Sequence, residues 1–167
     1  MGTCFDMVVR PLDRRLPVWP RKSVASRLEI GQARIILITL AAWLSACDLI
    51  VKLIEPTETG LYHRRTYFEL VFILAITAAA IYVVPYARSR MITVGAGFMV
   101  GGGFGNALSI AIFPLGVPNP FTVSQSGWTI AFNLADIAVA VGFLLATIGV
   151  WSLGSEHRHE LLSPVER

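Results

Sequence analysis

The chain has few charged residues, since Asp, Glu, Lys and Arg make up 15% of its 167 residues. Hydrophobic residues make up 54%, and the mean hydropathy is +0.63. A soluble domain usually carries about 25% charged residues. The composition therefore argues against an ordinary water-soluble fold and predicts a protein that resides in a lipid bilayer.

The net charge of +3 does not indicate a nucleic-acid-binding surface. Half of the 14 Lys and Arg residues precede the first long apolar run: Arg10, Arg14, Arg15, Arg21, Lys22, Arg27 and Arg34. Basic residues placed in this way flank a membrane segment and do not form a basic face. We therefore expect no nucleic acid among the partners.

Cysteine is scarce as well, because the chain has only Cys4 and Cys47. Two cysteines in such different settings form neither a disulfide framework nor a metal site, so we expect no metal and no cofactor. Residues 44–47 (Leu-Ser-Ala-Cys) are similar to the lipobox of a lipoprotein precursor. Three further apolar runs follow them, and we favour Cys47 as a small packing residue within a helix.

Long apolar runs are abundant by contrast. Four are long enough to span a bilayer as helices: residues 35–54, 68–86, 91–113 and 129–153. The sequence therefore predicts an all-α integral membrane protein, a bundle of four transmembrane helices formed by residues 35–153. Residues 1–34 are expected to form a basic tail and residues 154–167 a second, short tail.

The basic residues also predict the orientation of the bundle. With the N-terminus in the cytoplasm, eleven Lys and Arg residues outside the spans lie on the inner side. Only Arg64 and Arg65 lie on the outer side. Cytoplasmic loops carry the excess of positive charge in membrane proteins. Both termini are therefore expected in the cytoplasm, and the uncharged link of residues 114–128 is expected outside.

Polar residues inside the predicted spans recur at one depth. Asp48 and Lys52 are four residues apart and share a helix face. Asn106 on the third span, and Asn133 with Asp136 on the fourth, lie at a similar distance from the outer helix ends. Polar pairs that merely join helices, worth ~0.6 kcal/mol each, would be scattered in depth. We therefore favour a single polar site built from three helices.

The third span is rich in glycine, with Gly97, Gly101 and Gly105 spaced four apart. Small residues at this spacing let helices approach closely in membranes. We assign Gly102 and Gly105 to helix packing. The run is not a nucleotide-binding loop, because no strand precedes it.

These residues resemble three motifs of the signal peptidase II family. The glycine run that ends in Gly105 and Asn106 resembles the family's G-G-x-x-G-N, and residues 132–136, with Gly142, resemble its F-N-x-A-D followed by Gly. The run from Asp48 to Lys52 is similar to its D-x-x-x-K. The motifs cover three of the predicted spans in the family's order, and the resemblance runs from about residue 35 to residue 153.

The resemblance implies a fold, a location and a substrate. Members of the family are four-helix aspartyl peptidases of the bacterial inner membrane. They remove the signal peptide from diacylglyceryl-modified prolipoproteins, before the lipidated cysteine, at the outer side of the membrane. The resemblance therefore implies a multi-pass protein of the bacterial cytoplasmic membrane, with membrane lipids and lipidated prolipoprotein signal peptides as partners.

The catalytic pair of that family is incomplete in this sequence. Asp136 matches one carboxylate of the dyad. The other belongs to a G-x-V-x-D-F type stretch, where residues 116–121 read Gly-Val-Pro-Asn-Pro-Phe, so Asn119 stands in its place. An amide cannot take up a proton near neutral pH. The family's Asp-Arg is replaced by Ser109 and Ile110. The link of residues 55–67 is too short for the small β element and the N-x-G motif that family members carry there.

Three interpretations follow, and they differ in catalytic competence. In the favoured one, hydrolysis is weakened or lost, and a site supported by Asp48, Lys52, Asn106 and Asn133 still binds a lipidated peptide. In the second, Asp48 replaces the missing carboxylate and acts with Asp136. In the third, the protein is a small transporter or bundle protein in which these two aspartates relay protons.

Overall fold

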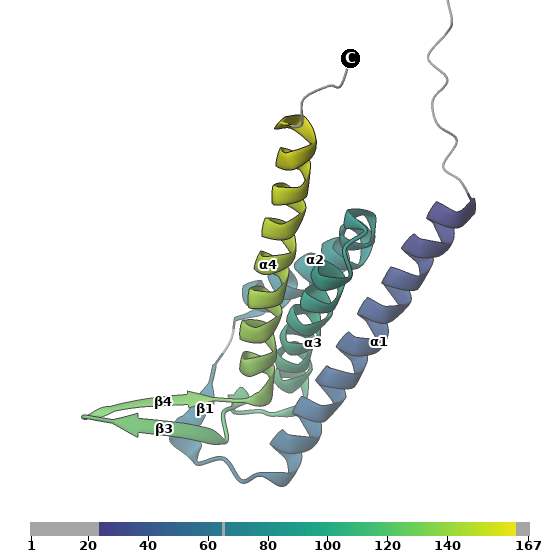
Figure 1. Ribbon diagram of the computed structural model, residues 1–167. Coiled ribbons are helices and arrows are strands. Elements are labelled where there is room, and N and C mark those ends of the chain that lie inside the picture. The colour runs from purple at the N-terminus through teal and green to yellow at the C-terminus, as the bar shows by residue number, and fades with distance from the viewer. Residues whose placement is uncertain (1–23, 65, 163–167) are drawn as a thin grey trace, which may run out of the picture.

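This computed structural model describes residues 24–64 and 66–162. Most of them are helical: α1 (Val24–Ile54), α2 (Tyr67–Val83), α3 (Arg90–Ile112) and α4 (Leu134–Leu162). All four contain a segment long and apolar enough to cross a membrane, as the hydropathy predicts. Figure 1 shows them side by side along the long dimension of the molecule. Residues 1–23 of the predicted basic tail, with Cys4, and residues 163–167 lie outside the described part of the chain.

The prediction for the start of the fourth helix is wrong. Residues 129–132 belong to strand β4 (Trp128–Phe132), and α4 begins at Leu134. A tight turn at Ser126 and Gly127, with φ of 50° and 87°, folds β4 back onto β3 (Phe121–Gln125). Positive φ at both central residues is typical of the hairpin turn whose twist matches that of the strands. The apolar run thus contains a strand and a helix in succession.

Three other helix boundaries also differ from the prediction by more than one residue. Helix α4 continues to Leu162, so residues 154–162 of the expected second tail are helical. Helix α1 begins at Val24, so part of the expected tail, residues 24–34, is helical. Helix α2 ends at Val83 and continues as the short 3-10 helix η2 (Val84–Ala87). Pro85 lies at the start of η2, where a missing backbone N–H costs no hydrogen bond. These differences leave the order of the four helices unchanged.

The centre of the bundle is α3, which packs most extensively against α4 and α1. Its glycines make this contact close. A Cβ at Gly101 would lie 2.9 Å from the Ala41 carbonyl oxygen on α1, and a Cβ at Gly95 would lie 2.7 Å from the Gly142 carbonyl oxygen on α4. No residue of α2 is buried, so this apolar helix lies at the edge of the bundle with most of its surface available to lipid.

The fold is mostly helical and not all-α, because the links between helices form short strands at one end of the bundle. Strand β1 (Tyr62–His63), which follows the 3-10 helix η1 (Thr59–Leu61), pairs antiparallel with β2 (Val117–Pro118). The link of residues 55–67 therefore holds one strand despite its short length. Strands β3 and β4 form a separate hairpin that extends sideways from the bundle (Figure 1).

The β3–β4 hairpin has two chemically different faces. Its register places Phe121 opposite Phe132 and Val123 opposite Ile130 on one face. The alternating residues Thr122, Ser124, Thr129 and Ala131 form the other face. The hydroxyls of Ser124 and Thr129 are hydrogen-bonded across the strands at 2.9 Å. The hairpin is therefore amphipathic.

Candidate functional site

The core of the polar cluster is a buried ion pair on α1. Asp48 and Lys52 lie one turn apart near the end of the helix, with Nζ 2.6 Å from Oδ2. Their side chains are 2% and 0% exposed. Nζ also donates to Asn106 Oδ1 at 2.8 Å and to Ser109 Oγ at 3.0 Å on α3. The ammonium group therefore joins α1 to α3 through acceptors that would otherwise be buried without a donor.

The second oxygen of Asp48 connects α1 to α4. Oδ1 accepts a 2.8 Å hydrogen bond from the backbone N–H of Ala135 in the first turn of α4. The first N–H groups of a helix have no partner within the helix, and a negative charge there is favourable because of the helix dipole. Gly105 leaves space for the carboxylate, since a Cβ at this position would lie 2.8 Å from Asp48 Oδ2.

Asn133 and Asp136 cap the start of α4. The N–H of Asp136 donates to Asn133 Oδ1 at 3.0 Å, and the N–H of Asn133 donates to Asp136 Oδ2 at 3.2 Å. This reciprocal pattern is a capping box. Asp136 Oδ1 accepts in addition from Asn106 Nδ2 at 3.1 Å, which links the cap to α3. Asp136 thus has a structural role whatever chemistry it performs.

Asn119 lies beside this cap, in the link that follows β2. The amide of Asn133 donates to Asn119 Oδ1 at 2.6 Å and to the Pro118 carbonyl oxygen at 3.3 Å. Asn133 is buried, whereas Asn119 and Asp136 are both half-buried. The cluster therefore has a closed interior around Lys52 and a partly open edge formed by Asn119 and Asp136.

The structure thus brings the predicted site residues into one connected hydrogen-bond network. It spans α1, α3, the start of α4 and the residue after β2. Asn133 precedes the fourth helix and does not lie within it, which corrects its expected position. Gly102 serves the same assembly, because a Cβ there would collide with the Ala135 carbonyl oxygen at the start of α4. The network lies at the end of the bundle that carries the β strands (Figure 1).

The polar contacts between the helices include two groups that are not among the predicted site residues. The backbone N–H of Ala135 carries no residue-specific signal. Ser45, by contrast, has one, since Ser45, Asp48 and Lys52 follow a spacing of three and four residues along one helix face. Its buried hydroxyl lies 2.8 Å from the carbonyl oxygens of both Ala41 and Gly101. Ser45 therefore extends the polar contact between α1 and α3 by one turn.

The types of side chain in this network limit the chemistry that it can perform. Within residues 24–64 and 66–162, no three His, Cys, Asp or Glu side chains lie close enough together to hold a metal ion. The partly open edge offers one carboxylate, at Asp136, and one amide, at Asn119. Such an edge can bind a peptide through hydrogen bonds, whereas a pair of carboxylates sharing a proton would require a second acid.

Comparison with known families finds a match to this chain. A family model described as Signal peptidase (SPase) II matches residues 57–152, more than half of the 167-residue chain. The matched region contains Asn106, Asn119, Asn133 and Asp136, and it begins after the Asp48–Lys52 pair. No curated protein and no solved structure gives a significant match to the chain.

Proposed function

The chain belongs to the signal peptidase II family, as its motifs predict, and from this premise we propose that it binds the signal peptides of diacylglyceryl-modified prolipoproteins with weakened or lost hydrolysis. Its four long apolar helices make it a multi-pass membrane protein. In the proposal, this membrane is the bacterial cytoplasmic membrane, both termini are cytoplasmic, and the polar network lies at the outer side.

The observation that carries the proposal is that Asn133 is hydrogen-bonded both to Asp136 and to an amide, Asn119, at the position where the resemblance places the second carboxylate. In an aspartyl dyad, one carboxylate activates water as a base while its protonated partner donates to the scissile carbonyl. Asn119 already accepts a 2.6 Å hydrogen bond from Asn133, and its amide side chain neither takes up nor releases a proton as an acid or base near neutral pH. The acid or base that a dyad requires at position 119 is therefore missing.

Asp48 is poorly suited to replace the missing acid. Its Oδ2 is bound by Lys52 and its Oδ1 by the N–H of Ala135, so both oxygens are occupied in a buried position. To act on a substrate it would have to leave an ion pair whose disruption is costly. The same contacts argue against a proton relay through Asp48, and family membership gives that alternative no support.

Retained binding is supported by the surroundings of the open edge. The apolar face of the β3–β4 hairpin starts at Phe121, two residues after Asn119, where its ring packs against that of Phe132 at a centroid distance of 5.8 Å. The face continues over exposed Val123 and Ile130 to Trp128. An apolar surface beside hydrogen-bonding groups suits a ligand that joins a peptide to acyl chains.

The test restores the missing acid with Asn119→Asp. The new carboxylate can still accept the hydrogen bond from Asn133, so the fold of the link is preserved. Purified wild type, Asn119→Asp and Asp136→Asn would be incubated with a diacylglyceryl-modified prolipoprotein peptide, and cleavage would be followed by mass spectrometry. Ser124→Asp is the matched control, because it adds the same charge on the hairpin away from the dyad position.

Acid or base action by a positioned group is worth about 10²- to 10⁴-fold in rate. We expect Asn119→Asp to cleave the peptide faster by a factor of this order, while wild type, Asp136→Asn and Ser124→Asp bind it with little or no turnover. Efficient cleavage by wild type that is abolished by Asp136→Asn would refute lost hydrolysis and make Asp48 the next residue to test. Failure of every variant to bind the peptide would refute the binding function.

A further inference from the structure

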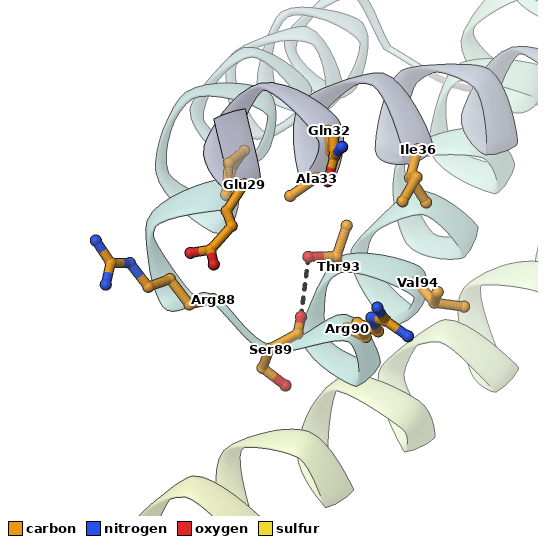
Figure 2. A pocket seen from close by; sticks show the side chains of 10 residues that line it. Glu29, Gln32, Ala33, Ile36, Arg88, Ser89, Arg90, Thr93 and Val94 are labelled. Atoms are coloured by element: carbon orange, nitrogen blue, oxygen red, sulfur yellow. Dashed lines mark hydrogen bonds between the residues drawn. The ribbon is translucent and has the colours of Figure 1, made fainter. Parts of the chain in front are cut away.

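A cavity of about 450 Å³ opens at the other end of the bundle, away from the polar network. It lies between the N-terminal part of α1 and the turn that joins η2 to α3, at the end of the bundle where α1 begins and α4 ends (Figure 1). Figure 2 shows its lining, with Glu29, Gln32 and Ile36 on α1 facing Arg88, Ser89 and Arg90. No residue of the proposed peptide site contributes to it.

The cavity changes from charged to apolar along its depth. Glu29 and Gln32 lie toward the N-terminal end of α1. Ile36 comes seven residues after Glu29, about 10 Å further into the bundle along the helix axis. Val94 lines the wall of α3 in the same way, one turn inward from Arg90. A phospholipid has the same arrangement, with a charged headgroup above its glycerol ester and acyl region.

Two guanidinium groups at this cavity are available to a ligand. Arg88 and Arg90 are exposed, and neither guanidinium group has a hydrogen bond or ion pair with a residue in the described part of the chain. The polar backbone of the turn, by contrast, is satisfied internally. Thr93 Oγ1 donates to the Ser89 carbonyl oxygen at 2.9 Å, and Ser89 Oγ accepts from the N–H of Ile92 at 3.3 Å. The two arginines are therefore the groups left to bind an anion.

The backbone of Arg88 strengthens the argument for its side chain. Arg88 has φ of 52° and ψ of 23°, the left-handed conformation that glycine adopts without strain. An arginine at such a position needs a reason other than backbone geometry. Contact between the Arg88 guanidinium group and a ligand of the cavity supplies such a reason.

We infer that this cavity binds the headgroup of an anionic phospholipid, with Arg88 and Arg90 on opposite sides of the turn at its rim (Figure 2). Basic pockets between transmembrane helices bind anionic lipid headgroups in this manner. Glu29, the third charged group of the lining, is an acceptor for headgroup hydroxyls and leaves a net charge of one positive unit. Phosphatidylglycerol, which has an anionic phosphate and two hydroxyl donors, fits this set better than phosphatidylcholine, whose quaternary ammonium has no donor.

The test measures lipid binding to the full-length protein in detergent by native mass spectrometry and by thermal shift. Phosphatidylglycerol, phosphatidylcholine and inorganic phosphate are added separately to wild type, Arg88→Gly and Arg90→Gln. Arg88→Gly removes the guanidinium group and also relieves the left-handed strain, so its melting temperature without lipid should not fall. Arg64→Gln is the matched control, because Arg64 lines a cavity of about 620 Å³ at the opposite end of the bundle.

A basic residue near a membrane surface contributes about 1 kcal/mol to the binding of anionic lipid, which is about fivefold in affinity. We therefore expect phosphatidylglycerol to bind Arg88→Gly and Arg90→Gln about fivefold more weakly than it binds wild type or Arg64→Gln. Phosphatidylcholine and inorganic phosphate should bind wild type more weakly than phosphatidylglycerol does. The basic N-terminal segment is the same in every variant, so its contribution cancels. Two results would overturn the inference. One is equal affinity for phosphatidylglycerol in wild type and all three variants, and the other is that wild type binds phosphatidylcholine as tightly as phosphatidylglycerol.

Discussion

Removal of the Lys52 ammonium group should destabilise the bundle more than any other single change in the network. Lys52→Met keeps an apolar stem of similar length and deletes the hydrogen bonds of Nζ to Asp48, Asn106 and Ser109. Asp48 then stays buried with one donor, the N–H of Ala135. Breaking a buried ion pair by removing one partner costs about 3–5 kcal/mol, and we expect a loss in this range.

The charge left on Asp48, and not the lost contacts of Lys52, should account for most of this loss. The double variant Asp48→Asn with Lys52→Met tests this separation, because Asn still accepts the hydrogen bond from Ala135 and leaves no uncompensated charge. Replacing both members of a buried pair is often close to neutral. We therefore expect the double variant to be more stable than Lys52→Met alone, by about 2 kcal/mol or more.

The free energy of unfolding of each variant is measured by reversible unfolding in mixed micelles with increasing dodecyl sulfate. Circular dichroism follows the loss of helix. Arg64→Met is the control, since it removes an exposed cation and should change stability by no more than about 0.5 kcal/mol. A loss below about 1 kcal/mol for Lys52→Met would contradict a structural role for the ion pair. A double variant less stable than the single one would show that the lost contacts, and not the unpaired charge, dominate.

Three further predictions concern packing, capping and topology. Gly105→Ala places a Cβ 2.8 Å from Asp48 Oδ2 and should cost about 1–3 kcal/mol, whereas Gly103→Ala, whose nearest contact is an ordinary 3.5 Å, should not destabilise the protein in the same unfolding assay. Asn133→Ala removes the side-chain cap of α4 and should cost about 1–2 kcal/mol in that assay, a value that a loss below about 0.3 kcal/mol would contradict. In a variant without native cysteines, membrane-impermeant thiol labelling of intact cells should modify Ser124→Cys and spare Ser89→Cys, and the opposite pattern would reverse the proposed orientation.

The helices and the meeting of polar residues could be predicted because both depend on local patterns. Hydropathy over about 20 residues identifies a span regardless of its neighbours. Helical spacing then places Asp48 and Lys52 on one face, and similar depth on three helices brings their partners within reach. The identity of each contact could not be predicted in the same way. The hydrogen bond from Ala135 to Asp48 comes from the backbone and joins residues 87 positions apart.

The wrong boundary of the fourth helix has an identifiable physical cause. Residues 129–132 are almost as apolar as the helix that follows, so hydropathy alone does not separate a strand from a span. Two local signals do mark the change, namely the turn at Ser126 and Gly127 and the capping residue Asn133. Both signals are present in the sequence, but the hydropathy of the whole apolar run predicts a longer helix. The fourth span is consequently shorter at its N-terminal end than its hydropathy suggests.

The network also explains why the fold does not depend on the side chain at position 119. Asn119 contacts the network through Asn133 at the open edge, whereas the helices are held together by Lys52, Asp48 and Asn106 in the interior. A carboxylate at position 119 would stand near Asp136, where two negative charges repel each other, and an amide removes that repulsion. Asn119→Asp is therefore expected to lower stability even if it restores hydrolysis. Activity in that variant must accordingly be expressed per folded molecule, since a gain in turnover and a loss of folded protein act in opposite directions on the measured rate.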